Sequence, residues 1–169
     1  MSATTSGDEI IAFTYPMNER LELRSFLDTY RGQRLGHIRF MHVSRKGKVS
    51  YSRNGICVGS QDLPHLHRAV EELAAVSSST YTGGDDPSVV YRFVKNAHEE
   101  VAAYTQAWSG DVFAHLRVLR ADENDQDWFT RKGISFPLEW MPVLQEATVA
   151  LVTLAKEEQQ ALIEELDSE

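Results

Sequence analysis

The hydrophobic and polar positions in the first half of the chain predict four strands. Residues 10–15 form a short apolar and aromatic run, and residues 21–26 alternate with a period of two. The alternation returns over residues 34–43, and a fourth strand-like segment spans residues 48–58. Gly55 lies within this last segment, where a glycine is typical of a kink or bulge.

After the fourth strand, the period changes to that of a helix. Apolar side chains recur every three or four positions, which predicts an amphipathic helix with one buried face. Pro64 stands where the first turn of a helix tolerates proline, and Ser60 or Asp62 can cap that turn. The apolar positions of the predicted helix are Leu63, Leu66, Val70, Leu73 and Ala74.

The same plan recurs 78 positions later without a gap. His37-Ile38-Arg39 aligns with His115-Leu116-Arg117, and Ser52–Ile56 aligns with Thr130–Ile134. The match joins residues 10–73 to residues 88–151. The second copy predicts strands near 89–95, 100–108, 112–119 and 126–136, and a helix from about 139 to 166.

Two tandem ββββα units predict an α+β fold. A four-stranded sheet covered by one helix buries only one face, and a unit of this size is marginal alone. We therefore expect an intramolecular pseudo-dimer with its two helices packed centrally. The expected parts are a basic first unit at 10–76, a Ser/Gly/Asp/Pro-rich linker at 77–87 and an acidic second unit at 88–166 with an extended helix.

Charge is distributed unevenly between the units. The formal net charge of the 169 residues is −8, which by itself argues against nucleic-acid binding. Residues 30–73 nevertheless carry eight basic and three acidic groups, whereas residues 108–151 carry four and seven, and residues 152–169 carry one and six. Most of the basic residues of the first unit lie in two predicted strands and their turn: Arg31, Arg34, Arg39, Arg45, Lys46, Lys48 and Arg53.

The basic strands also present a one-sided surface. In the third predicted strand, His37 and Arg39 share the face opposite Ile38 and Phe40. Cations that follow phosphates, together with rings that stack on bases, are what single-stranded nucleic-acid binding requires. The corresponding loop of the second unit, residues 122–127, is acidic and would repel phosphate. The rings near the basic strands are Tyr30, Phe40 and Tyr51.

Other classes of function find little support in the sequence. No Ser/His/Asp arrangement, metal-ligand spacing or nucleotide-binding loop is present, so we expect neither an enzyme nor a metal or cofactor site. The single Cys57 excludes an internal disulfide. No apolar run reaches the roughly 20 residues of a membrane span, and the first residues do not resemble a signal peptide. We expect a cytoplasmic protein, associated with the nucleoid in a prokaryote.

Two short segments carry a resemblance to a known family. Arg131–Phe136, and with departures Arg53–Val58, resemble the Arg/Lys-Lys-Gly-Ile-Ser-Leu strand of the positive cofactor four family of single-stranded-DNA-binding transcriptional coactivators. Asn54 and Cys57 replace a basic residue and a serine of that pattern. The family's Ile-Arg-Glu-like strand, which follows a Lys-Gly-Lys turn, resembles Ile38-Arg39 after Arg31-Gly32-Gln33, and Leu116-Arg117 after Ser109-Gly110-Asp111. The order of elements also agrees, and the resemblance covers both units.

The resemblance implies a whirly-like fold and single-stranded DNA binding on the curved outer face of the sheet, in transcription, replication or repair. Family members usually pair as homodimers, so this chain resembles a fused, tandem version of prokaryotic or phage type. The implied phosphate contacts are Arg39, Arg53, Arg117, Arg131 and Lys132, and the implied stacking rings are Tyr51 and Phe129 or Trp128. With the charge pattern, the expected interface comprises Arg31, Arg34, His37, Arg39, Arg45, Lys46, Lys48, Tyr51, Arg53, His115, Arg117, Trp128, Phe129, Arg131 and Lys132.

An interaction or assembly module is the alternative hypothesis. The acidic second unit and its long helix would then recruit a transcription or replication protein or pair two chains, and nucleic-acid binding would be weak or lost. RNA on the same face is a third hypothesis. The chain would be a monomer with pseudo-twofold symmetry or a homodimer.

Overall fold

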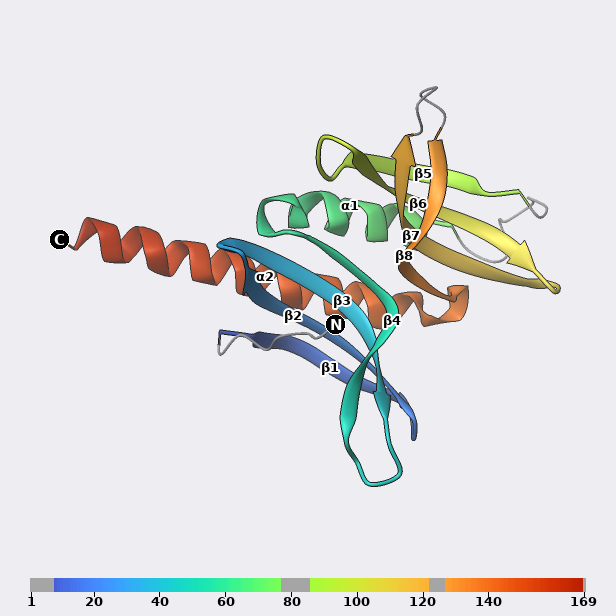
Figure 1. Cartoon of the computed structure of the whole chain (residues 1–169), viewed down its shortest axis with the longest axis horizontal. Coiled ribbons are helices and arrows are strands. Elements are labelled where there is room, and N and C mark those ends of the chain that lie inside the picture. Colours follow the sequence, from blue (N-terminus) through green and yellow to red (C-terminus); the bar gives the residue numbers. More distant parts are fainter. Residues whose placement is uncertain (1–7, 77–85, 122–126, 169) are drawn as a thin grey trace.

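The computed structural model describes residues 8–76, 86–121 and 127–168, and in these it forms one sheet with two long helices (Figure 1). Most of the predicted linker (77–85) and most of the acidic loop (122–126) lie outside the described residues. The strands are β1 (Ile10–Asn18), β2 (Leu21–Tyr30), β3 (Gln33–Val43), β4 (Val49–Gly59), β5 (Ser88–Val94), β6 (Glu99–Trp108), β7 (Asp111–Ala121) and β8 (Asp127–Pro137). The helices are α1 (Leu63–Ala74) and α2 (Met141–Asp167), each preceded by a 3₁₀ turn, η1 (Ser60–Asp62) and η2 (Leu138–Trp140).

The sheet runs in the order β1-β2-β3-β4-β8-β7-β6-β5. Within each half, successive strands pair antiparallel, and the two halves meet only where β4 lies beside β8, at Asn54, Gly55 and Gly133. This mirrored order gives two ββββα units in tandem. The predicted α+β class and the two units are therefore confirmed.

Tight turns join the second and third strands of each unit. Arg31 and Ser109 both have φ of 52°, and each precedes a glycine with positive φ, Gly32 or Gly110. Two successive positive φ values are typical of the turns that close two-residue hairpins, because their twist matches that of the strands. The local chemistry of the turn thus repeats along with the hydrophobic pattern.

Each helix packs on the sheet of the other unit. In α1, His65 stacks against Phe93 of β5 with ring centroids 5.5 Å apart. In α2, the Ala147 carbonyl accepts a hydrogen bond of 2.9 Å from the buried Ser25 hydroxyl of β2. The helices also contact each other, as when Gln145 Nε2 donates to Glu71 at 3.1 Å. The predicted central helix pair is confirmed, with the helices exchanged between the units.

A single core follows from this exchange. Leu23, Ile38, Leu66, Leu116 and Leu144 belong to one buried cluster that draws on both sheets and both helices. Neither unit has its full core without the other, because the cluster includes residues from both units. Burial of this kind stabilises a fold by roughly 25 cal/mol per Å² of apolar surface removed from water.

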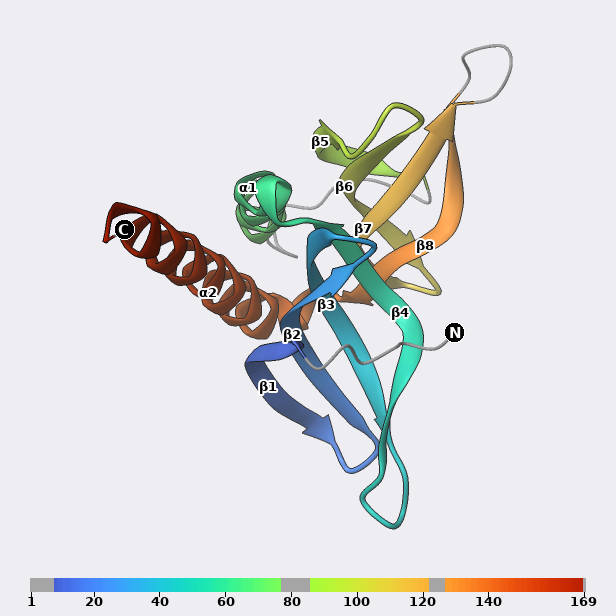
Figure 2. The same cartoon turned by 60° about the vertical axis from the view of Figure 1, so that its left-hand side comes forward.

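Some elements extend beyond their predicted bounds. β1 continues through Pro16 to Asn18, which an edge strand permits because one side of its backbone needs no partner. α2 runs to Asp167, and its C-terminal turns extend away from the body of the protein (Figure 2). In the described residues, no helix has the length and hydropathy that crossing a membrane requires.

Candidate nucleic-acid interface

The face of the sheet turned away from the helices carries the repeated polar and aromatic residues. Ile38 and Phe40 are buried in the core on the helix side, so His37 and Arg39 face outward, as their alternation predicts. The same alternation places His115 and Arg117 on the outer face of the second unit, opposite the buried Leu116. We call this surface the outer face.

A three-ring cluster occupies the outer face of the first unit. The rings of Phe26 and His37 stack with centroids 4.5 Å apart, and Tyr51 packs against Phe26 at 5.9 Å. Phe26 is fully buried, whereas Tyr51 is 36% exposed. The cluster therefore has a fixed base and one accessible ring.

The second unit repeats the cluster at the same 78-residue offset. Tyr104 stacks on His115 at 4.6 Å and contacts Phe129 at 4.8 Å. Phe129 is 42% exposed. Trp128, which is 48% exposed, is the adjacent residue of the same strand and so projects from the opposite face of β8. Of the two candidate rings in the second unit, Phe129 is the one that the structure brings to this cluster.

One arginine in each unit lies flat against the sheet next to its cluster. Arg39 donates from NH1 to the Ser52 carbonyl at 2.9 Å. A Cβ atom built on Gly55 would lie 2.6 Å from the guanidinium carbon of Arg39, so glycine at this position leaves the space that the arginine fills. The bulge predicted at Gly55 appears as a register shift between β3 and β4 just beyond the Arg39–Gly55 pair.

Arg117 is held by more partners than Arg39. Its Nε donates to the Tyr104 hydroxyl at 3.1 Å, NH1 donates to the Thr130 carbonyl at 3.2 Å, and NH2 donates to the Ser135 hydroxyl at 2.7 Å. Gly133 lies opposite it with φ of 151°, where a side chain would collide with the backbone of Leu116 and Arg117. These bonds fix the guanidinium and leave it fewer donors for a ligand.

Burial shifts the titration of both histidines. Desolvation, followed by the charge of Arg117, lowers the pKa of His115 to about 4. Desolvation also lowers the pKa of His37, although Asp28 opposes the shift through a contact of 2.8 Å to Nε2. Near neutral pH, His115 is an uncharged ring, and its Nδ1 lies 2.7 Å from the Ser135 hydroxyl.

The remaining candidate cations fall into three groups. Arg45, Lys46 and Lys48 lie exposed in the turn between β3 and β4, which projects from the body in Figure 1. Arg31 is exposed in the β2–β3 turn, with its guanidinium carbon 5.2 Å from the Tyr30 ring centroid. The third group is exposed around the seam between β4 and β8, and consists of Arg53, Arg131 and Lys132, of which Lys132 pairs with Glu99 at 3.7 Å.

Arg34 lies apart from these groups. Arg34 is three positions before the outward-facing His37 in β3, so its side chain points to the opposite face, the helix side of the sheet. There its NH2 forms an ion pair of 2.7 Å with Glu158 of α2. NH1 lies 3.3 Å from an Asp8 carboxylate oxygen. Hydrogen bonding to Glu158 raises the pKa of Arg34, which therefore carries a paired charge that holds α2 against β3. The structure does not bring Arg34 together with the outer-face residues.

Three residues of the interface region were not identified from the sequence. Phe26 and Tyr104 form the buried bases of the ring clusters, and their match in the 78-residue repeat could have indicated a shared role. Glu9 accepts a hydrogen bond of 2.6 Å from the Tyr51 hydroxyl. Nothing in the local sequence links positions 9 and 51, because the two residues are 42 positions apart and meet only in the folded chain.

The described residues contain no cluster of three or more histidine, cysteine or acidic side chains arranged to hold a metal ion.

No protein-family model matches the chain, and no curated protein matches it. Among solved structures, the chain is similar to a bacteriophage T5 homolog of the eukaryotic transcription coactivator PC4, implicated in recombination-dependent DNA replication. The two are 25% identical, and the match covers 50% of this chain and 99% of that one with a TM-score of 0.37. At this TM-score the similarity assigns neither fold nor function to the chain.

Proposed function

We propose that the protein binds single-stranded DNA on the outer face of its sheet, without catalysis, and acts in transcription, replication or repair. The observation that carries this proposal is the repeated arrangement of one arginine and one accessible ring on each unit: Arg39 with Tyr51, and Arg117 with Phe129. Rings that stack on bases contribute about 1–3 kcal/mol each, and every base offers a face for stacking.

The first unit carries the stronger part of the proposed interface. The exposed cations Arg45, Lys46 and Lys48 extend its basic surface beyond the ring cluster, and Arg53 adds a further exposed charge near the seam. Arg39 has no ion-pair partner among the described residues, whereas Arg117 donates three hydrogen bonds within the protein. We therefore assign most of the affinity to the first unit.

Arg34 is left out of the proposed interface. Its guanidinium is paired with Glu158 on the other side of the sheet, and a phosphate on the outer face would not reach it. The side chains of Trp128 and Phe129 point to opposite faces of β8, so Trp128 is also left out of the proposed stacking rings.

The test is the joint change Arg39→Ala and Arg53→Ala, measured by fluorescence anisotropy with labelled oligo(dT). We expect the affinity to fall about tenfold or more and the salt dependence to become shallower, because two phosphate contacts are lost. The matched control is Arg68→Ala with Lys156→Ala, which removes the same charge from the two helices. Equal losses in both variants would show that only net charge matters and would refute the site.

A competing RNA oligonucleotide of matched sequence tests the preference for DNA.

A further inference from the structure

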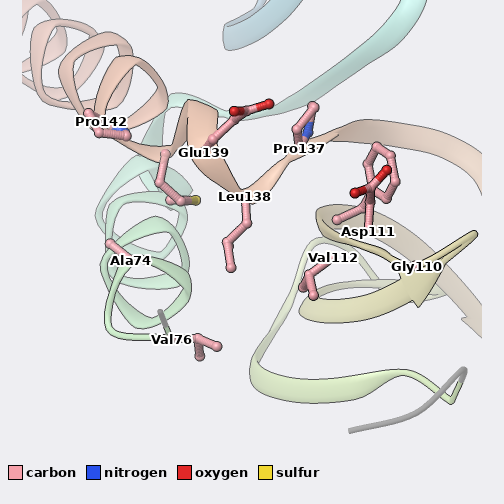
Figure 3. Close-up of a pocket in the computed structure, with 11 residues that line it drawn as sticks. Ala74, Val76, Gly110, Asp111, Val112, Pro137, Leu138, Glu139 and Pro142 are labelled. Carbon is pink, nitrogen blue, oxygen red and sulfur yellow. The ribbon is translucent and has the colours of Figure 1, made fainter. Parts of the chain in front are cut away.

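A surface groove lies at the end of the second unit where β7 begins, beside the ends of the two helices. It has a volume of about 740 Å³ and runs between the end of α1, the β6–β7 turn and the start of α2 (Figure 3). Leu138 projects into the space between α1 and the first residues of β7. The apolar side chains that line it include Val76, Val112, Phe113, Leu138 and Met141, and the acidic residues Asp111 and Glu139 also belong to its lining.

The equivalent place in the first unit is occupied by a helix of the same chain. The 78-residue offset relates Val112 to Arg34, and Arg34 forms its ion pair with Glu158 of α2. The preceding turn of α2 packs on the core through Val152, Leu154 and Ala155. The groove of the second unit differs because α1 ends at Ala74, whereas α2 continues to Asp167.

The groove of the second unit and the equivalent surface of the first unit carry charges of opposite sign. In the first unit, the residues that correspond to the groove lining include Gln33, Arg34 and Gln61, and the segment that covers them bears Glu158. In the second unit, Asp111, Val112 and Glu139 stand at those three positions. An acidic helix therefore suits the first unit, and a basic helix has the complementary charge for the second.

We propose that this groove binds an amphipathic helix of a partner protein, whose apolar face covers Val112, Leu138 and Met141 and whose lysine or arginine side chains reach Asp111 and Glu139. The mode is that of a helix laid in a groove, with α2 on the first unit as its internal counterpart. This inference does not depend on DNA binding, because none of the residues of the proposed DNA interface lines the groove.

Charge also decides against other occupants of the groove. The end of α2 from a second copy exposes Leu162, Ile163 and Leu166, but it carries Glu164 and Glu165 beside them and would be repelled by the acidic groove. A phosphate backbone would be repelled for the same reason.

The experiment titrates two labelled peptides into the full chain by fluorescence anisotropy. One has the sequence of residues 150–167 with Glu157, Glu158, Glu164 and Glu165 changed to lysine, and the other keeps the four glutamates. A third peptide has the composition of the basic one in scrambled order. We expect the basic peptide to bind with one-to-one saturation and at least about tenfold more tightly than either of the others. Only the basic peptide combines an apolar helix face with lysine side chains that complement the acidic residues of the groove.

Paired variants separate the groove from general charge attraction. Asp111→Lys with Glu139→Lys should abolish most of the binding, whereas Glu164→Lys with Glu165→Lys makes the same change of net charge at the far end of α2 and should leave it intact. All four side chains are exposed, so the fold should tolerate the changes. Equal losses in the two variants, equal binding of the scrambled peptide, or no saturable binding of the basic peptide would each overturn the proposal.

Discussion

The side chain of Asn54 forms two hydrogen bonds with the backbone of Ser135 and so joins the two halves of the sheet. Its Nδ2 donates to the Ser135 carbonyl at 2.9 Å, and its Oδ1 accepts from the Ser135 N–H at 2.7 Å. The strands β4 and β8 share few backbone pairs, so this amide supplies contacts that a regular ladder would otherwise provide. The repeat places Lys132 at the equivalent position in the second unit, where its amine reaches Glu99 instead.

Asn54→Ala should therefore destabilise the whole protein. The change leaves a partly buried donor and acceptor of Ser135 without partners, which costs about 1–3 kcal/mol. Urea unfolding followed by circular dichroism measures the loss. Arg53→Ala, at the exposed neighbouring position, is the control and should change stability by no more than about 0.5 kcal/mol. Equal stability of the Asn54 variant and the parent protein would show that the bridge does not contribute.

Glu158→Gln should loosen the end of α2 without weakening DNA binding. The ion pair with Arg34 is only partly exposed, with side-chain exposures of 28% and 21%, and its loss should cost about 1 kcal/mol. Hydrogen exchange should accelerate in residues 155–167 and stay unchanged in β7. A large loss of oligo(dT) affinity in this variant would contradict the placement of Arg34 outside the interface.

Glu9→Gln should strengthen DNA binding. Glu9 places a carboxylate 2.6 Å from the hydroxyl of Tyr51, and burial followed by this hydrogen bond raises the pKa of Tyr51 to about 12. Removing the charge relieves repulsion of phosphate beside an accessible ring, so the affinity for oligo(dT) should rise several-fold. Glu19→Gln, in the exposed β1–β2 turn, makes the same change of charge away from Tyr51 and should have a smaller effect. Equal gains in both variants would refute a specific role for Glu9.

Acid should destabilise the protein through His115. Its pKa of about 4 in the folded state lies below the ordinary value of 6.5, so the unfolded chain takes up the proton first as the pH falls. This contribution to stability is fully retained above about pH 6.5 and declines toward pH 4. Partial solvent screening limits the loss between pH 7 and pH 5 to about 1 kcal/mol. Urea unfolding at both pH values should give a smaller difference for His115→Gln, and an identical difference would contradict the assignment.

The repeat and the alternation of side chains were sufficient to predict most of the fold. Because Ile38 and His37 point to opposite faces of a strand, the sequence alone places the histidine and Arg39 on the outer face. The same alternation places the side chain of Arg34 on the helix side of the sheet, together with that of Ile38. Its positive charge nevertheless led to its inclusion in the predicted interface, since charge clustering along the chain does not separate the two faces.

Contacts between distant segments could not be predicted from local patterns. The partner of Arg34 is Glu158, and the partner of Asn54 is Ser135, and both pairs depend on how the two units assemble. Hydrophobic periodicity predicts that a helix has a buried face but does not specify which sheet covers it. The exchange of α1 and α2 between the units was therefore visible only in the structure.

The most direct test of single-stranded DNA binding is a titration of labelled oligo(dT) with the full chain at a series of salt concentrations. We predict saturable binding at low salt and a linear fall of the logarithm of the binding constant with the logarithm of salt concentration, by about 0.7 for each phosphate contacted. The absence of saturable binding at low salt, or an affinity that does not change with salt, would contradict a cationic outer face that binds DNA.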